Sequence, residues 1–279
     1  MKISIKKITP AIGLVLSLGF VSCQDNSLLT PNVPAVASAR TGGNLTLPYR
    51  LTKYGDDSLT YLANGQLRQV TYSPKRGATQ THTNYAYSAN SIKAVTYNGL
   101  SVRRDDTYFV DVNGRCFEAK EIRYVLVNGV YQPVETNLIF AYNAKGQLIG
   151  SYDKNNVLRR TDYTFDLTGD LFQIIERFPN STPIKNTLIY SQPVGSPLLN
   201  DQYPLNFYWT GMHDGFLPIF GTPSKHLVRL ITQSSFDGSP VLNDRFFSYA
   251  FDVQGYVVKK EMYNGVGGPV ADTKLYKYN

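Results

Sequence analysis

The stretch "YNAKGQLIGSYDKNNVLRRTDYTFDLTGDL", residues 142–171, repeats nearly the same pattern three times. Each copy has an aromatic residue, three mostly polar residues, Gly or Asn, one further residue and an aliphatic residue. In the first copy, Asn143 to Lys145 suit a type I turn, and Gly146 suits the left-handed bulge position after it, because Gly adopts positive φ at little cost. The pattern therefore predicts a β-hairpin turn, with the aromatic residue closing one strand and the aliphatic residue opening the next.

The hairpin pattern recurs along the chain. Its copies are Tyr61–Leu67, Tyr142–Leu148, Tyr152–Leu158, Phe165–Leu171 and Phe251–Val257, with weaker copies at Tyr87–Lys93 and Val110–Cys116. Further hairpin turns are indicated at Asn98-Gly99, Asn128-Gly129 and Asn264-Gly265. Flanking residues alternate as strands do, and no long stretch of the mature sequence has a convincing helical period. We therefore expect an all-β fold, an antiparallel meander of about 12–16 short strands in a curved sheet, open barrel or sandwich.

Three copies of the pattern, "YDKNNVL", "FDLTGDL" and "FDVQGYV", resemble the Tyr-Asp repeat units of large bacterial wall and toxin-shell proteins. The turns are irregularly spaced here, so only the local hairpin unit carries over. Across its mature length the chain resembles uncharacterised Bacteroidetes-type lipoproteins built of such hairpins, with a non-repetitive interruption before the last strands, here residues 203–230. That resemblance implies the architecture and a lipid anchor, and it implies no activity and no catalytic residues.

The N-terminus has the features of a secretion signal. Three lysines precede an apolar run that ends at residue 21, and this run is too short for a stable membrane span. Because the small residue Ser22 is followed directly by Cys23, the segment resembles a bacterial lipoprotein signal, in which the Cys23 thiol receives a diacylglycerol and becomes the new N-terminus. We expect an outer-membrane lipoprotein of the cell envelope that faces the periplasm or the cell surface.

The chain divides into three parts by composition. Residues 1–22 are the predicted signal peptide, and residues 23–45 are the acylated Cys and a flexible tether rich in Pro, Ser, Ala and Gly. Residues 46–279 form a single predicted domain of β-hairpin repeats, interrupted by an irregular aromatic segment at about 199–225. With Cys23 acylated, Cys116 has no partner for an intramolecular disulfide, and we expect it to be a buried residue on a strand.

The charge of the chain does not favour nucleic-acid binding. The formal net charge is +7, and removal of the three signal-peptide lysines lowers it to about +4. Basic residues are scattered and followed by acidic ones, as in "VRRDD" (102–106) and "LRRTD" (158–162). These stretches indicate a solvated strand face, so we expect no nucleic-acid partner.

No metal site or cofactor site is predicted. His82, His213 and His226 lie far apart and match no metal-ligand spacing. The segments "DVNGR" (111–115) and "DKNN" (153–156) begin like calcium loops but lack the closing acidic ligand, so their Asp and Asn residues are interpreted as turn formers.

No catalytic residues are predicted either. Asp56-Asp57 and Asp105-Asp106 are adjacent pairs, whose side chains point to opposite faces on a strand or are solvated in a loop. The sequence has no GxSxG motif and no P-loop. We expect that the protein is not an enzyme, although a Ser, His and Asp brought together by folding stays open.

The aromatic segment holds the candidate ligand residues. It crowds six ring-bearing residues into an irregular stretch bounded by Pro: Tyr203, Phe207, Tyr208, Trp209, His213 and Phe216. Such a segment either plugs one end of the sheet or offers a binding surface, and the plug is favoured because large aromatic side chains bury well.

Three functions follow from these features. The first is a non-enzymatic, lipid-anchored envelope protein that binds a partner or ligand, or scaffolds an assembly. The second is a carbohydrate-binding accessory lipoprotein, with Tyr208 and Trp209 as the stacking platform. The third is a hydrolase with a spatially assembled site. The expected partners are the membrane, through the lipid anchor, and a protein or glycan.

Overall fold

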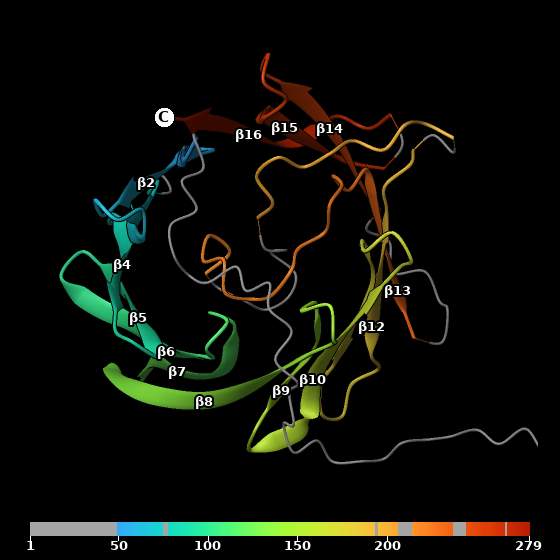
Figure 1. The fold of residues 1–279 in the computed structure, drawn as a ribbon. Coiled ribbons are helices and arrows are strands. Elements are labelled where there is room, and N and C mark those ends of the chain that lie inside the picture. Colours follow the sequence, from blue (N-terminus) through green and yellow to red (C-terminus); the bar gives the residue numbers. More distant parts are fainter. Residues whose placement is uncertain (1–48, 75–77, 193–194, 206–213, 237–243, 266) are drawn as a thin grey trace, which may run out of the picture. The chain divides into compact units, whose positions relative to one another are not determined.

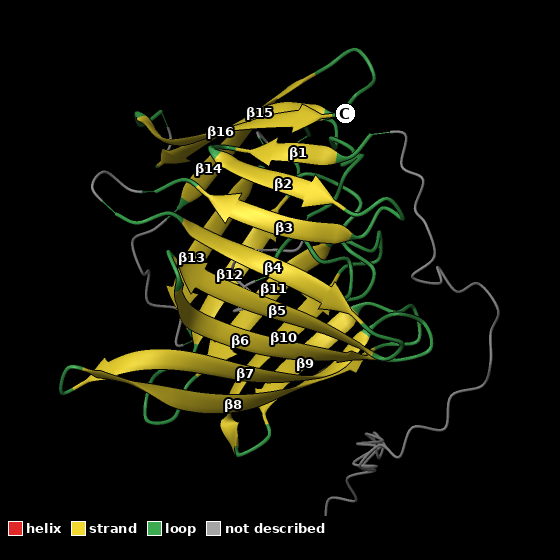
Figure 2. Cartoon of the chain, turned by 90° about the vertical axis from the view of Figure 1, so that its left-hand side faces the viewer, coloured by secondary structure: helices red, strands yellow, loops and turns green. Residues whose placement is uncertain are grey.

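The computed structural model describes residues 49–74, 78–192, 195–205, 214–236, 244–265 and 267–279. These residues form sixteen strands, which pair antiparallel in chain order and close into a barrel. Figure 1 views the barrel from one end and Figure 2 views it from the side. The strands are β1 Leu51–Tyr54, β2 Asp57–Tyr61, β3 Leu67–Tyr72, β4 Thr81–Tyr87, β5 Ser91–Asn98, β6 Ser101–Val110, β7 Cys116–Val127, β8 Val130–Tyr142, β9 Leu148–Asp153, β10 Asn156–Phe165, β11 Leu171–Arg177, β12 Ile184–Ile189, β13 Leu230–Ser235, β14 Arg245–Phe251, β15 Val257–Asn264 and β16 Val270–Tyr278.

The barrel closes between its first and last strands. β1 pairs with β16 through Leu51 with Tyr278 and Tyr54 with Tyr276. The predicted all-β antiparallel meander is therefore confirmed, and the sheet is a closed barrel rather than an open barrel or a sandwich. Within the described ranges, no helix is long and apolar enough to cross a membrane.

Five copies of the repeated pattern form the predicted bulged turns. The pairing register shifts beside each of them, between Thr60 and Tyr61, Phe109 and Val110, Ala141 and Tyr142, Thr164 and Phe165, and Ala250 and Phe251. In each turn the Gly has positive φ, for example 76° at Gly146. Because every second connection of a meander lies at the same end, these five turns share one end of the barrel, which we call the bulge end.

Two other copies of the pattern differ from the prediction. Tyr152–Leu158 does not form the predicted turn, because β9 ends at Asp153 and pairs with Asn156 across a tight connection at the opposite end of the barrel. The register of this hairpin shifts beyond the connection, between Asn156 and Arg160. β9 runs from the Gly146 turn to this connection, so the two lie at opposite ends of the barrel. The repeated sequence pattern does not indicate at which end a turn lies. The weaker copy at Tyr87–Lys93 is a hairpin, but its register runs through Tyr87 and Ile92 without a bulge.

Side chains alternate between the lumen and the outer wall. Paired residues such as Leu59 and Val70, or Tyr108 and Ala119, point inward and are at most 4% exposed. Residues beside them, such as Lys120, point outward. The core of the protein is therefore the barrel interior, and Cys116 is fully buried in it, as the sequence indicates.

Tyrosine hydroxyl groups connect neighbouring strands at the bulge end. Each donates to the carbonyl of the first residue of the preceding strand, in five bonds: Tyr61 to Leu51 (2.7 Å), Tyr87 to Leu67 (2.9 Å), Tyr142 to Cys116 (2.6 Å), Tyr190 to Leu171 (2.8 Å) and Tyr278 to Val257 (3.1 Å). These strand pairs are joined covalently only at the opposite end. The tyrosine bonds thus connect, at the bulge end, strand pairs that have no turn there.

Loss of one tyrosine bond tests this interpretation. Tyr142→Phe keeps the buried ring but leaves the Cys116 carbonyl without its donor, so we expect the free energy of unfolding to fall by about 1–2 kcal/mol. The control is Tyr152→Phe on the outer wall of β9, where the side chain is 37% exposed and we expect a change within about 0.5 kcal/mol. Urea denaturation measures both values. Equal effects of the two substitutions would show that the hydroxyl bond does not stabilise the bulge end.

Candidate functional site

The chain between β12 and β13 enters the barrel at the bulge end. Residues 214–228, which we call the plug segment, run inside the ring of strands in Figure 1. Leu217, Ile219 and Phe220 are at most 5% exposed and belong to the core. The Phe220 ring lies 5.4 Å from the Phe140 ring and 5.9 Å from the Tyr108 ring. The plug segment therefore fills part of the lumen with apolar side chains.

Backbone bonds fix the plug segment to the bulged turns. The Cys116 amide donates to the Ile219 carbonyl (2.7 Å), and the Thr222 amide donates to the Gly146 carbonyl (2.8 Å). Gly221 has φ of +84°, and a Cβ atom at this position would lie 2.4 Å from the Gly146 carbonyl oxygen. Only Gly fits this close approach, so the contact of the plug with the β8–β9 turn depends on this residue.

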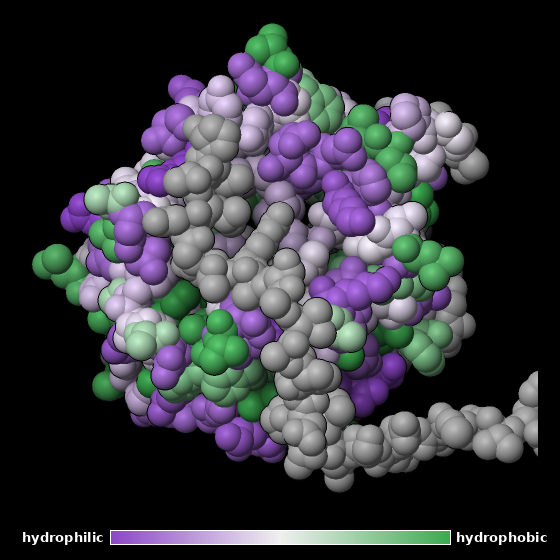
Figure 3. All heavy atoms as spheres, viewed as in Figure 1, coloured by the Kyte–Doolittle hydropathy of each residue, from purple (hydrophilic) through white to green (hydrophobic). Residues whose placement is uncertain are grey.

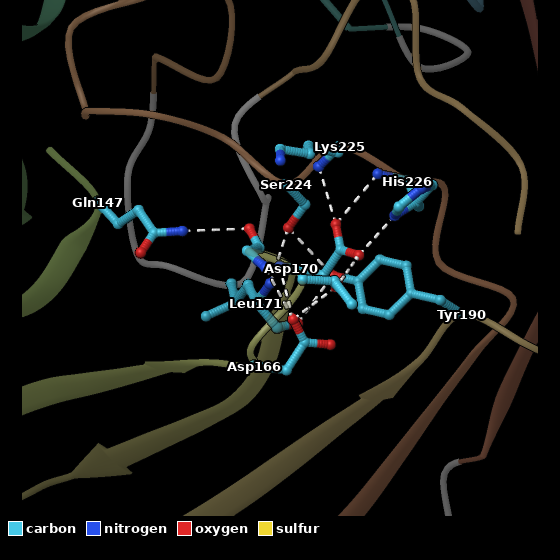
Figure 4. Close-up of polar contacts among 10 residues, drawn as sticks. Gln147, Asp166, Asp170, Leu171, Tyr190, Ser224, Lys225 and His226 are labelled. Carbon is cyan, nitrogen blue, oxygen red and sulfur yellow. Dashed lines mark hydrogen bonds and ion pairs between the residues drawn. The ribbon is translucent and has the colours of Figure 1, made fainter. Parts of the chain in front are cut away.

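A polar latch joins the end of the plug segment to the β10–β11 turn, as Figure 4 shows. Asp170 is 1% exposed and accepts hydrogen bonds from the backbone amides of Lys225 (2.8 Å) and His226 (3.1 Å), and His226 Nδ1 lies 2.5 Å from its carboxylate. Burial favours a raised pKa for Asp170, but the hydrogen bonds from His226 and the backbone outweigh burial and lower the pKa. The carboxylate is thus held in its charged form.

The latch places a Ser, a His and an Asp near one another without a catalytic arrangement. The Ser224 hydroxyl accepts from the Leu171 amide (2.9 Å) and lies 3.0 Å from the Tyr190 hydroxyl, whereas His226 bonds to Asp170. A relay for hydrolysis requires the His to contact the Ser. These bonds of Ser224 and His226 instead serve to hold the plug.

Asp214, at the start of the plug segment, forms the second polar contact with the wall. It is 4% exposed and accepts hydrogen bonds from the hydroxyl groups of Tyr85 (2.7 Å) and Tyr108. Burial raises the pKa of both tyrosines, and the neighbouring Asp214 charge raises it further. Both hydroxyl groups therefore remain protonated donors to Asp214.

A charged cluster lies beside Asp214 on the inner wall. Arg104 bonds to Asp106 and to Glu121 (2.8 Å), and Arg123 lies 3.4 Å from Glu121. Arg104, Asp106 and Glu121 are at most 8% exposed. Burial raises the pKa of Asp106 to about 8, and Arg104 opposes this effect only in part. Counted with Asp214, the cluster has the carboxyl groups of Asp106, Glu121 and Asp214 and the guanidinium groups of Arg104 and Arg123. One proton retained on a carboxyl group therefore makes the net charge of the cluster zero.

This cluster corrects the interpretation of "VRRDD" as a solvated strand face. Asp105 does point outward, where it pairs with Lys93 (3.1 Å). Arg104 and Asp106 instead point into the lumen. Strand alternation predicts that adjacent residues face opposite sides, but the sequence does not show which side is the lumen.

The predicted ligand aromatics are only partly described. Tyr203 is half-buried against the Tyr278 ring, with 5.8 Å between the ring centroids. Phe207, Tyr208, Trp209 and His213 lie outside the described residues, as does Cys23. Whether these aromatics form a plug or a platform stays a prediction, while Phe216 packs on Tyr54 at 5.5 Å.

The described parts of the chain contain no metal cluster. No three His, Cys, Asp or Glu side chains are placed to hold an ion within these parts. His82 stacks on Tyr97 at the outer wall, and His226 belongs to the latch. The two loops that begin like calcium sites are turns, in which Asp111 and Asp153 accept hydrogen bonds from nearby backbone amides.

The outer wall carries a polar cleft of about 470 Å³. Its lining residues are Thr60, Arg68, Gln69, Asn84 and Tyr85. Gln69 donates to Asn84 (2.7 Å) across β3 and β4. Arg68 is exposed and has no ion-pair partner among the described residues. The cleft therefore presents hydroxyl, amide and guanidinium groups to solvent.

Comparison with known proteins shows the class of fold. No protein-family model matches the sequence, and no curated protein sequence matches it. A porin-like protein from Bacteroides uniformis ATCC 8492 has a similar structure, with a TM-score of 0.58, 14% identity, and coverage of 80% of this chain and 90% of that chain. A porin-like protein from Bacteroides vulgatus ATCC 8482 has a TM-score of 0.58, 16% identity, and coverage of 82% and 98%. The chain thus has the β-barrel fold of Bacteroides porin-like proteins.

The proton retained on Asp106 in the charged cluster makes the free energy of unfolding depend on pH. The folded pKa of Asp106, about 8, lies above its ordinary value of 3.8. The unfolded chain therefore releases this proton near pH 4 while the folded protein keeps it to about pH 8, so this group lowers the free energy of unfolding as pH rises between these values. Asp106→Asn should weaken the decline of the melting temperature over this range. Asp105→Asn, at the outer wall, should keep the wild-type decline, and an unchanged decline in Asp106→Asn would contradict the assignment.

Proposed function

We propose that this protein is a non-enzymatic, lipid-anchored barrel of the cell envelope that binds a partner or ligand, or scaffolds an assembly. The observation that carries the proposal is the combination of a filled lumen with a charged outer wall. A conducting transmembrane barrel has the reverse arrangement, with an apolar outer band and a polar, water-filled interior.

The outer wall supports a barrel that stands in water. Its outward side chains form ion pairs around the barrel: Lys93 with Asp105 (3.1 Å), Lys120 with Glu135 (2.8 Å), Lys154 with Glu118 (3.2 Å), Arg177 with Asp162 (2.9 Å) and Lys259 with Glu261 (2.6 Å). Charged side chains facing lipid strongly destabilise a membrane barrel near the bilayer midplane. These pairs therefore favour solvent over lipid around the wall.

The lumen supports a role other than conduction. A sixteen-stranded barrel is wide enough for an aqueous channel if its interior is left open. Here inward aliphatic and aromatic residues, together with Leu217, Ile219 and Phe220 of the plug segment, form one buried cluster. The backbone bonds and the Asp170 latch hold that segment in place.

Two buried side chains, Cys116 and Ser224, support a non-enzymatic role. Cys116 is fully buried, and burial raises the pKa of its thiol. Ser224 is 8% exposed, and its hydroxyl is engaged by Leu171 and Tyr190. Neither side chain is placed to attack a substrate from solvent.

Membrane attachment is proposed to depend on acylated Cys23. The test replaces residues 1–22 with an ordinary cleaved secretion signal and carries Cys23→Ala, so that neither lipid nor retained signal holds the chain. This variant should move from the membrane fraction to the soluble periplasmic fraction, because the ion pairs on the barrel wall favour water over lipid. An outer-membrane variant that resists alkaline extraction would indicate a transmembrane barrel, and a soluble wild-type protein would exclude the anchor.

Carbohydrate binding is the second candidate function, and the polar cleft on β2, β3 and β4 favours it. Amide, hydroxyl and guanidinium groups match the hydrogen-bonding groups of sugars, and these groups of the cleft are open to solvent.

The test of this second function is retention on immobilised glycans. Arg68→Ala combined with Asn84→Ala should lower the affinity for any glycan that retains the wild-type protein by about tenfold or more, because each side chain contributes hydrogen bonds in the cleft. Thr187→Ala, on the outward face of β12 away from the cleft, serves as the control. Equal retention of both variants would exclude this cleft as the glycan site.

A further inference from the structure

The same position is apolar in all five bulged turns. It is the residue two places after the one that closes the strand, and it is occupied by Ala63, Val112, Ala144, Leu167 and Val253. We call these five the turn-tip residues. Val112, Leu167 and Val253 are 94%, 100% and 96% exposed, and both alanines are also exposed. Turn tips are ordinarily polar, so an aliphatic residue at each tip calls for a surface that covers it.

The turn-tip residues are spread around the whole rim. Val112 lies between β6 and β7, Leu167 between β10 and β11, and Val253 between β14 and β15, so successive tips are four strands apart in a ring of sixteen. Ala63, between β2 and β3, occupies the remaining quarter. Figure 3 views this end and shows isolated hydrophobic side chains among hydrophilic ones. The arrangement is a ring of separate contacts rather than one continuous patch.

Exposed cations accompany the turn-tip residues. Lys145 lies in the β8–β9 turn and Lys225 at the end of the plug segment, and neither side chain has an ion-pair partner among the described residues. The carboxylates of three bulged turns bond to the backbones of their own turns. Asp111, Asp166 and Asp252 accept hydrogen bonds from the amides of Asn113, Gly169 and Gln254. Aliphatic and cationic groups are therefore exposed together at this end, beside polar turn residues such as Asn64, Thr168 and Gln254. Aliphatic and cationic groups are the combination that suits the surface of a bilayer containing anionic lipids.

The described chain begins at the bulge end, and the predicted anchor precedes it in the sequence. Tyr49 packs on Tyr256 of the β14–β15 turn, with 5.1 Å between the ring centroids, and the Arg50 amide donates to the Asn279 carbonyl (3.2 Å). Cys23 precedes Tyr49 by 49 − 23 = 26 residues. The chain to the acylated residue thus begins at the end that carries the turn-tip residues.

We propose that the turn-tip residues contact the lipid bilayer that holds acylated Cys23, so that the bulge end faces the membrane. This inference rests on the lipid anchor of the proposed function and adds an orientation to it. The three large aliphatic side chains enter the boundary between headgroups and acyl chains, and Lys145 and Lys225 approach the lipid phosphates. Few side chains insert, so the contact is weak alone and orients a barrel that the lipid anchor retains.

The opposite end of the barrel is the competing surface. Leu100, in the β5–β6 turn, is 100% exposed, and the β7–β8 hairpin carries Leu126 (60%) and Val130 (63%) near its tip. That hairpin projects beyond the other strands in Figure 2. Two features favour the bulge end. The 26-residue connection to Cys23 starts there, and the turn-tip residues are spread evenly around the rim, so that all quarters of the rim can contact a flat lipid surface at once.

Site-specific quenching distinguishes the two ends. The full-length lipidated protein is reconstituted into vesicles of phosphatidylethanolamine and phosphatidylglycerol, with an environment-sensitive fluorophore on Leu167→Cys or on Leu100→Cys. These residues form a matched pair, because both are leucines that are 100% exposed at turn tips of opposite ends. The buried native Cys116 is not labelled. A quencher on the lipid acyl chains should remove most emission from residue 167 and leave the emission from residue 100 unchanged.

A second measurement tests whether the aliphatic side chains cause the contact. With the fluorophore on Ala144→Cys, the combined substitution of Val112, Leu167 and Val253 by Ser should abolish most of the quenching at residue 144. The same number of Ser substitutions at Leu100, Leu126 and Val130 should leave it intact. All six positions are exposed, so both variants should melt like the wild-type protein.

Each outcome decides between defined alternatives. Quenching at residue 100 but not at residue 167 would overturn the orientation, and quenching at neither would show that the barrel stands clear of the bilayer. Dimerisation that the bulge-end Ser substitutions abolish would assign the turn tips to a second copy and overturn the proposal. Failure of the lipid anchor is distinguishable from all of these, because the protein would then be absent from the vesicles.

Discussion

The hydrogen bond from a tyrosine hydroxyl to the first carbonyl of the preceding strand is the interaction on which the bulge end depends. A meander joins each strand covalently to one neighbour at a given end, and the tyrosine bond supplies the connection to the other neighbour. Tyr61, Tyr87, Tyr142, Tyr190 and Tyr278 form five such bonds of 2.6–3.1 Å. In the copies of the repeated pattern that begin at Tyr61, Tyr87 and Tyr142, the aromatic residue therefore both ends a strand and bonds to the preceding strand.

The closed rim gives the plug segment a fixed surface to bind. Ile219 and Thr222 bond to backbone groups of the bulged turns, and Asp170 receives the amides of Lys225 and His226. Behind these contacts, Asp214 meets Tyr85 and Tyr108 in the lumen. The result is a porin-like fold whose interior is packed and whose outer wall carries ion pairs, and the proposed role in binding or scaffolding rests on these two features.

Local features of the fold could be predicted from the sequence, and long-range ones could not. The turn at Gly146 is fixed by residues within a few positions of it, so its bulge and positive φ follow from the pattern. The carbonyl that accepts from Tyr142 lies 26 residues away, and the Asp214 carboxylate that accepts from Tyr85 lies 129 residues away. Strand alternation separates Asp105 from Asp106, but only the closed barrel shows that Asp106 and Arg104 face the lumen. The aromatic segment indicated a plug, whereas the contacts of Gly221 and Ser224 had no signal in the sequence.

Hydrogen exchange of the unlipidated chain in detergent-free buffer tests the central claim most directly, which is that the barrel stands in water with its plug segment in place. The amides of Thr222, Lys225, His226 and Leu227 each donate a backbone or carboxylate hydrogen bond in the structure. The account predicts a monodisperse protein in which these four amides exchange as slowly as those of the strands around them. A protein that requires detergent to stay in solution, or plug amides that exchange at the rate of an unfolded chain, would contradict it.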